Sequence, residues 1–170
     1  MTTVQNTVLL KKGAQGSNVK QLQAKLNAWV IDSGTLPGAI LVEDGIFGTA
    51  TERIVKFFQC HHFLQMDGVV GSQTMGCLNR GLASLPTLKM GSTGVIVQRL
   101  QQVLDMYGIN VGAIDGIYGA KTRAAVMRFQ NDYHIFDVKG QATGEVNLNT
   151  WTYLAKEPAG MACGPIRSIS

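Results

Sequence analysis

The residues best suited to chemistry in this chain are the string Cys60-His61-His62 and a third histidine, His134. Thiol and imidazole groups are common zinc ligands and common partners in nucleophilic catalysis. Neighbouring residues on a helix point about 100° apart, so His61 and His62 cannot share one metal ion as a pair four residues apart does. Neither HExxH nor GxSxG occurs. We therefore expect no catalytic residue, no metal site and no cofactor.

Composition limits the remaining classes. The chain has 170 residues, 45% apolar and 15% charged, which suffices for one medium or two very small globular units. Its net charge of +4 is spread over both halves without a run dense in lysine and arginine, so no nucleic-acid partner is expected. No apolar run reaches about eighteen residues, and the start "MTTVQNTVLLKKG" does not resemble a secretory signal. We expect no membrane insertion and see no export signal.

The three cysteines, Cys60, Cys77 and Cys163, cannot all pair within one chain, and none belongs to a CxxC motif. We interpret them as small buried thiols or thiols of the C-terminal tail. A disulfide or a metal role is not expected.

The chain spells the same blocks twice. "LKKGAQGSNVKQLQAKL" at 10–26 aligns without gaps to "LKMGSTGVIVQRLQQVL" at 88–104. "DGIFGTATERIVKFFQ" at 44–59 aligns in the same way to "DGIYGAKTRAAVMRFQ" at 115–130. A third block, "DGVVGSQTMGCL" at 67–78, aligns to "TGEVNLNTWTYL" at 143–154 after a short insertion. Three blocks in the same order twice indicate a tandem duplication.

Each block predicts a helix, because its apolar residues recur at helical spacing and do not alternate. In the first blocks these residues are Val19, Leu22, Leu26 and Trp29, and Val97, Leu100, Leu104 and Tyr107. Glycines mark the turns before the helices. The fold class is therefore all-α, with two tandem three-helix domains.

The expected boundaries are a first domain over 1–80, a linker over 81–87, a second domain over 88–156 and a flexible tail over 157–170. The linker "NRGLASLPT" begins just inside the first domain, and Pro86 marks its end. The tail shows no periodicity.

These blocks resemble the peptidoglycan-binding domain 1 family, a three-helix cell-wall module often fused to bacterial hydrolases. Its pattern is L-[RK]-x-G-x-x-G-x-x-V-x-x-L-Q, then D-G-x-[FY]-G-x-x-T, then D-G-x-[VA]-G-x-x-T-W-x-x-L. The first copy matches all three blocks, with Met75 at the usual tryptophan. In its third block the second copy keeps Gly144 and Trp151 but has Thr143 for Asp and Asn147 for Gly. The resemblance covers about residues 10 to 155.

The resemblance implies binding of wall glycan and stem peptide in a shallow groove, without bond-making. Such a groove needs flat apolar faces, hydrogen-bond donors and cations for the carboxylates of the stem peptide. The candidate ligand-binding residues lie at the entrance to the second helix of each copy: Asp44, Phe47, Thr51 and Arg53, and Asp115, Tyr118, Thr122 and Arg123. Each also has an alternative structural role. The aromatic rings could fill the core, the aspartates could form turns, and the arginines could be solvated.

Gln59 and Gln130 end the second block, and we interpret them as holding the connection between the second and third helices. Three functions stay open. The chain could be a non-catalytic wall-binding protein, a structural or assembly adaptor that keeps the fold without wall binding, or the targeting part of a cell-wall lytic enzyme. Its partners would be peptidoglycan and, in the second and third cases, an assembly partner or a hydrolase. The family implies the cell envelope, the periplasm or the exterior, whereas the start of the chain leaves the cytoplasm or a phage open.

Overall fold

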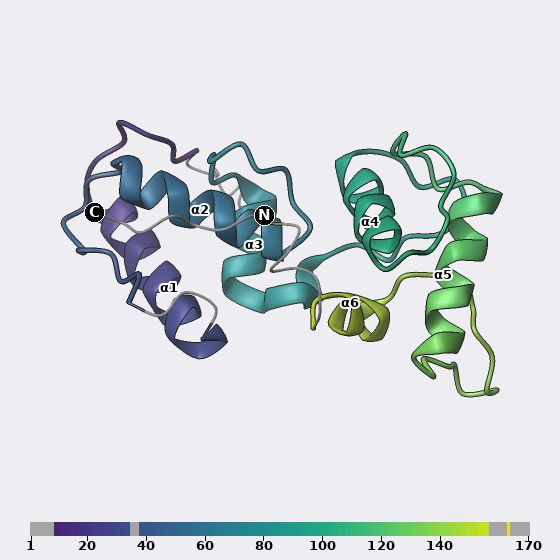
Figure 1. The fold of residues 1–170 in the computed structure, drawn as a ribbon. Coiled ribbons are helices and arrows are strands. Elements are labelled where there is room, and N and C mark those ends of the chain that lie inside the picture. Colours follow the sequence, from purple (N-terminus) through teal and green to yellow (C-terminus); the bar gives the residue numbers. More distant parts are fainter. Residues whose placement is uncertain (1–8, 35–37, 157–162, 164–170) are drawn as a thin grey trace, which may run out of the picture. The chain divides into compact units, whose positions relative to one another are not determined.

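The computed structural model describes residues 9–34, 38–156 and 163, and helices joined by turns and irregular connections make up this part. Six α-helices and one short 3-10 helix, Gly81–Ser84, follow one another in this part (Figure 1). Strand pairing in the described residues is limited to isolated bridges. The predicted all-α class is confirmed.

The first unit holds three helices: α1 (Ser17–Ser33), α2 (Thr49–His61) and α3 (Ser72–Arg80). Helix α1 buries Val19, Leu22 and Leu26 of the predicted stripe, together with Val30. Trp29, which was also predicted for this stripe, is only partly buried. It ends at Gly34, which has φ 61° and so takes the left-handed conformation that favours glycine. The described residues of this unit fall within 1–59 and 66–81.

The second unit repeats the arrangement with α4 (Val95–Met106), α5 (Ala120–Asp132) and α6 (Leu148–Leu154). Its core is centred on Trp151, which is fully buried and donates its indole N–H to the Pro86 carbonyl at 3.0 Å. Residues 60–65 belong to this unit, and its other described residues fall within 82–165. Phe63 attaches residues 60–65 to the core of this unit, since the centroid of its ring lies 4.8 Å from that of Trp151.

The segment before the first helix of each unit pairs with both later connections. Leu10 bridges to Val70 and Gln15 to Ile46, and in the second unit Leu88 bridges to Val146 and Thr93 to Ile117. The three blocks of a copy therefore meet at one end of its helices. At the closest approach Gly45 and Gly116 have positive φ, and a β-carbon there would lie 3.1 Å from the carbonyl oxygen of Gly16 or Gly94. Only glycine fits these two turns without strain.

None of the helices in the described residues is long and apolar enough to span a membrane.

Candidate ligand-binding surface

A buried glutamine organises the connection between α1 and α2. The Gln23 side-chain oxygen accepts the Gly45 backbone N–H at 2.9 Å, and its amide nitrogen donates to Asp44 Oδ1 at 2.9 Å and to the Ile46 carbonyl at 3.1 Å. A further contact joins this nitrogen to Thr51 Oγ1 at 3.3 Å. One side chain thus satisfies three groups of the turn and fixes it against the start of α2. We call this arrangement the glutamine clasp.

The glutamine clasp occurs at all four connections between consecutive α-helices within the two units. Gln59 holds the α2–α3 connection, Gln101 the α4–α5 connection and Gln130 the α5–α6 connection. In each case the glutamine oxygen accepts a glycine N–H, from Gly68, Gly116 and Gly144 respectively. In each case its nitrogen also contacts a threonine hydroxyl: Thr74, Thr122 and Thr150. The expected role of Gln59 and Gln130 is confirmed, whereas Gln23 and Gln101 were not singled out from the sequence.

The fourth clasp lacks the aspartate yet keeps its geometry. Thr143 replaces the carboxylate, and its hydroxyl accepts the Glu145 N–H at 3.1 Å. Asn147, which stands where the family has glycine, accepts the Thr150 N–H and so caps α6. The departures of the second copy from the family pattern therefore carry their own local compensation.

The two aspartates of the candidate set form the turns of their clasps. Asp44 Oδ1 accepts the Ile46 N–H at 2.8 Å, and Asp115 Oδ1 accepts the Ile117 N–H at 2.9 Å. The pKa of Asp44 is lowered mainly by the donor from Gln23 and then by the Ile46 N–H. The pKa of Asp115 is lowered mainly by the Ile117 N–H and then by Gln101. Both carboxylates are exposed, so they combine a turn-forming role with access to solvent.

The two aromatic candidates lie in the core. Phe47 is 1% exposed and Tyr118 is fully buried, so neither ring offers a face to a ligand in this structure. The Tyr118 hydroxyl donates to the Gly144 carbonyl at 2.8 Å, and burial raises the pKa of this phenol. Thr51 and Thr122 are buried as well, in the clasps described above. As ligand contacts these four residues remain predictions that their burial does not favour.

The two arginine candidates lie on the first turns of α2 and α5, where Arg53 is partly exposed and Arg123 is exposed. Next to the clasps, Ile46 and Ile117 expose about half of their surface, at 50% and 54%. Aliphatic, carboxylate and guanidinium side chains are thus all accessible near the entrances to α2 and α5.

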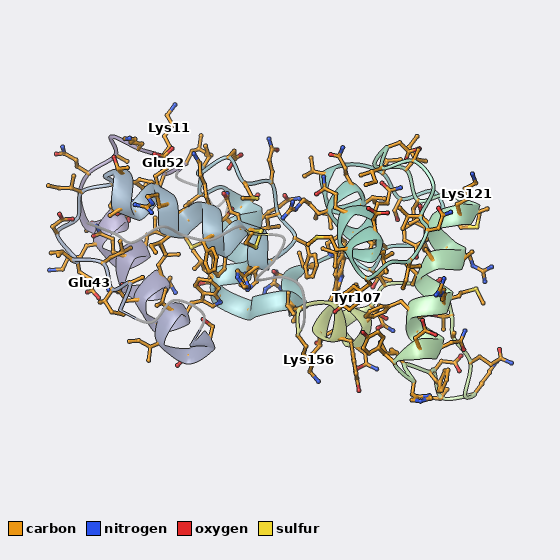
Figure 2. The ribbon with its side chains drawn as sticks, viewed as in Figure 1. Lys11, Glu43, Glu52, Tyr107, Lys121 and Lys156 are labelled. Atoms are coloured by element: carbon orange, nitrogen blue, oxygen red, sulfur yellow. A yellow bond between two sulfur atoms is a disulfide. The ribbon has the colours of Figure 1, made fainter. Side chains whose placement is uncertain are left out.

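A charged network covers the first of these helix entrances. Glu52 lies between Lys56, whose Nζ is 3.0 Å from Oε1, and Lys12, whose Nζ is 3.4 Å from Oε2 (Figure 2 labels Glu52 on α2). The Lys56 side chain first, and Lys12 after it, lower the pKa of the Glu52 carboxyl.

The family model described as "Putative peptidoglycan binding domain" matches residues 15–78 and again residues 93–154, which is more than half of the chain. The chain belongs to this family and carries two copies of its domain.

Its relatives include N-acetylmuramoyl-L-alanine amidases. A probable N-acetylmuramoyl-L-alanine amidase of Bacillus licheniformis is 33% identical over 154 residues, which cover 78% of this chain and 42% of the amidase. The N-acetylmuramoyl-L-alanine amidase CwlL of the same organism is 32% identical, over 72% of this chain and 39% of that protein. The chain thus spans about two fifths of the length of these relatives. A solved Burkholderia AP3 phage endolysin is 27% identical over 71% of this chain and 38% of the endolysin, with a TM-score of 0.41.

The cysteine prediction was wrong for two of the three residues. Cys60 and Cys163 form a disulfide across 103 positions of sequence, whereas Cys77 is a buried thiol as expected. The predicted flexible tail otherwise lies outside the described residues. Arg99 donates to the Cys60 sulfur at 3.0 Å, and burial lowers the pKa of this guanidinium. Among the described residues, no group of three or more His, Cys, Asp or Glu side chains could hold a metal ion.

Proposed function

We propose that this chain is a non-catalytic targeting part that holds a larger cell-wall lytic protein on peptidoglycan, by binding glycan and stem peptide. The observation that carries the proposal is the pair of family domains, matched at 15–78 and 93–154, in a chain that aligns to only about two fifths of amidases that act on the wall. The similarity to the amidases concerns binding domains, and bond cleavage would belong to another part of the protein.

The binding surface that we propose comprises the outer sides of the helix entrances. Asp44 and Arg53 would act in the first unit, and Asp115 and Arg123 in the second, because their side chains reach solvent while the neighbouring rings do not. Carboxylates and guanidinium groups pair with the amide and carboxylate groups of a glycan-linked peptide. Two copies on one chain increase retention when both engage the same polymer. The site of action would be the cell envelope, reached by an exported or phage-borne parent protein.

Co-sedimentation of the full chain with purified sacculi tests this function. The chain should pellet with sacculi at low salt and release no soluble fragments from them. Replacing Arg53 and Arg123 together by Gln should weaken pelleting, whereas replacing Arg128, an arginine of α5 outside the proposed surface, by Gln should not. Failure of the wild-type chain to pellet, or release of wall fragments by the pure chain, would contradict the proposal.

A further inference from the structure

The two units carry different side chains at three equivalent surface positions. Glu52 and Arg123 each stand eight residues after the aspartate of their turn, and Lys56 and Met127 each stand twelve after it. Lys12 and Met90 each stand two residues after the bridging leucine of their first block. The backbone that carries these side chains is the same in both units.

Backbone contacts at these positions confirm the equivalence. The Gly13 N–H donates to the Phe47 carbonyl at 3.0 Å, and the Gly91 N–H donates to the Tyr118 carbonyl at 3.0 Å. Helices α2 and α5 each contain 13 residues and begin at the same distance from the DG turn. Differences between the two surfaces therefore reflect their side chains.

In the first unit two lysines share one carboxylate, which leaves these three positions with a net charge of +1. Glu52 bridges Lys12 and Lys56 at 3.4 and 3.0 Å, so its carboxylate already has two cations and each lysine has a counter-ion. An incoming carboxylate would have to compete with Glu52 for both ammonium groups. At these three positions the first unit therefore offers an anion only ammonium groups that already contact Glu52, and no guanidinium that could bind a carboxylate through two parallel hydrogen bonds.

In the second unit the same positions form what we call the Met–Arg shelf: Met90, Arg123 and Met127. Met90 is 56% exposed, Arg123 is exposed and Met127 is half-buried. Among the described residues Arg123 forms no ion pair, and the only hydrogen bond of its side chain is a long contact of 3.5 Å from Nη2 to the Thr143 carbonyl. Arg123 is exposed, so most of its five N–H donors are open to solvent. The two methionines stand at the positions equivalent to Lys12 and Lys56, which both contact Glu52 in the first unit.

The stem of Arg123 is held in place by a glycine. A β-carbon on Gly144 would lie 2.8 Å from Arg123 Cγ and 2.8 Å from Met127 Cγ, so both side chains lie directly over this backbone. The buried Tyr118 hydroxyl bonds to the carbonyl of the same glycine. Packing on a fixed connection reduces the conformational freedom that Arg123 loses when it binds a ligand.

We propose that the Met–Arg shelf is the peptide-binding site of this chain and that it binds a C-terminal carboxylate preceded by residues with small apolar side chains. The first unit lacks this activity. The proposal deepens the proposed function and rests on it, because the peptide it implies is the stem peptide of the wall. A guanidinium binds a carboxylate through two parallel hydrogen bonds. Methionine side chains adapt to the small alkyl groups of the residues that precede that carboxylate.

A titration of the full chain, labelled at its methionine methyl groups, tests the site. The probe is diacetyl-L-lysyl-D-alanyl-D-alanine, compared with the same peptide ending in a carboxamide. The acid should shift the methyl signals of Met90 and Met127, assigned by substitution, and the amide should bind at least about tenfold more weakly, since a charge-assisted bidentate contact is lost. Equal binding of acid and amide would overturn the proposal.

Matched variants locate the activity on the shelf. Arg123→Gln should reduce binding of the acid at least about tenfold, whereas Arg128→Gln removes the same charge from the same helix and should leave binding unchanged. The exchange Lys12→Met, Glu52→Arg and Lys56→Met should create a second peptide site in the first unit. Unchanged binding in Arg123→Gln, or no second site in a folded exchange variant, would contradict the proposal.

Co-sedimentation separates this inference from the function on which it rests. If the wild-type chain pellets with sacculi but does not bind the peptide acid, wall binding stands and the Met–Arg shelf is not its peptide site. If the chain binds the acid and does not pellet, the peptide site stands and the proposed wall function fails.

Discussion

At the scale of single residues, the buried glutamines do the most to organise the candidate surface. Each one accepts a glycine N–H, donates to a turn carbonyl and contacts a threonine hydroxyl, as Gln101 does with Gly116, Ile117 and Thr122. A buried donor or acceptor that loses its partner costs about 1–3 kcal/mol. Gln101 also donates to Asp115, so a buried side chain fixes an exposed carboxylate of the proposed site.

We expect Gln101→Met to lower the free energy of unfolding of the second unit by about 2–4 kcal/mol. Methionine has a similar length, but it cannot accept the Gly116 N–H, so this buried donor loses its partner, and the donated contacts to Asp115 and the Ile117 carbonyl are lost as well. Chemical denaturation followed by circular dichroism measures the loss. Gln98→Met is the control, because Gln98 lies exposed on the same helix. Equal stability of the two variants would show that the clasp is unimportant.

The same variant should raise the pKa of Asp115 toward its ordinary value, since Gln101 is the second of the donors that lower it. A carboxyl whose pKa is lowered by folding contributes stability above its unfolded pKa of about 3.9, and this contribution is lost as the pH falls through the lower folded value. Carbon-detected NMR titration of the carboxyl below pH 5 measures the change. An unchanged titration would mean that the Gln101 contact does not act on the carboxylate.

The sequence predicted the roles of some of these residues better than others. An aspartate before glycine is a reliable turn signal, and Asp44 and Asp115 form such turns. The aromatic after the turn has no comparable signal, because a ring between two glycines can point either way, and only packing against the helices buries Phe47 and Tyr118. Gln23 and Gln101 could have been found from the sequence, since each follows a leucine at the same position of both first blocks.

At the scale of elements, the connections carry more of the specificity than the helices. The helices of the two units were predictable from apolar spacing alone, because their stripes recur at the same positions. The connection before α6 was not, since Thr143 and Asn147 replace the expected residues and restore the turn through contacts that no pattern describes. This connection also supports the Arg123 and Met127 side chains of the Met–Arg shelf.

Two glycines in this connection allow a matched test. Gly144 and Gly140 both have positive φ, at 66° and 73°, so alanine is strained at either position. A new β-carbon at Gly140 meets nothing within 4 Å, whereas at Gly144 it meets Arg123 and Met127. We expect Gly144→Ala to destabilise the second unit by about 1–3 kcal/mol more than Gly140→Ala, because of this overpacking. Thermal or denaturant unfolding measures the difference, and equal losses would show that Arg123 and Met127 move aside without cost.

At the scale of the whole molecule, a duplicated backbone carries surfaces that have diverged. The glutamine clasps are present in both units, whereas three equivalent surface positions outside them differ. These positions hold Lys, Glu and Lys in the first unit and Met, Arg and Met in the second. One feature has no counterpart between the copies: the Cys60–Cys163 disulfide, whose residues are 103 positions apart. Sequence could not reveal this pair, because three cysteines without a characteristic spacing carry no pairing information.

The disulfide encloses the whole second domain in a covalent loop. Closing a loop of this length restricts the unfolded chain, and in proteins such a bond contributes about 2–4 kcal/mol. We therefore expect Cys163→Ser to lower the melting temperature of the second unit, and a reducing agent to cause the same loss in the wild type but none in the variant. Thiol titration of the unfolded wild-type chain without reductant should detect one thiol of the three cysteines. Three reactive thiols, or a reductant effect of equal size in Cys163→Ser, would rule out the bond as the source of this stability.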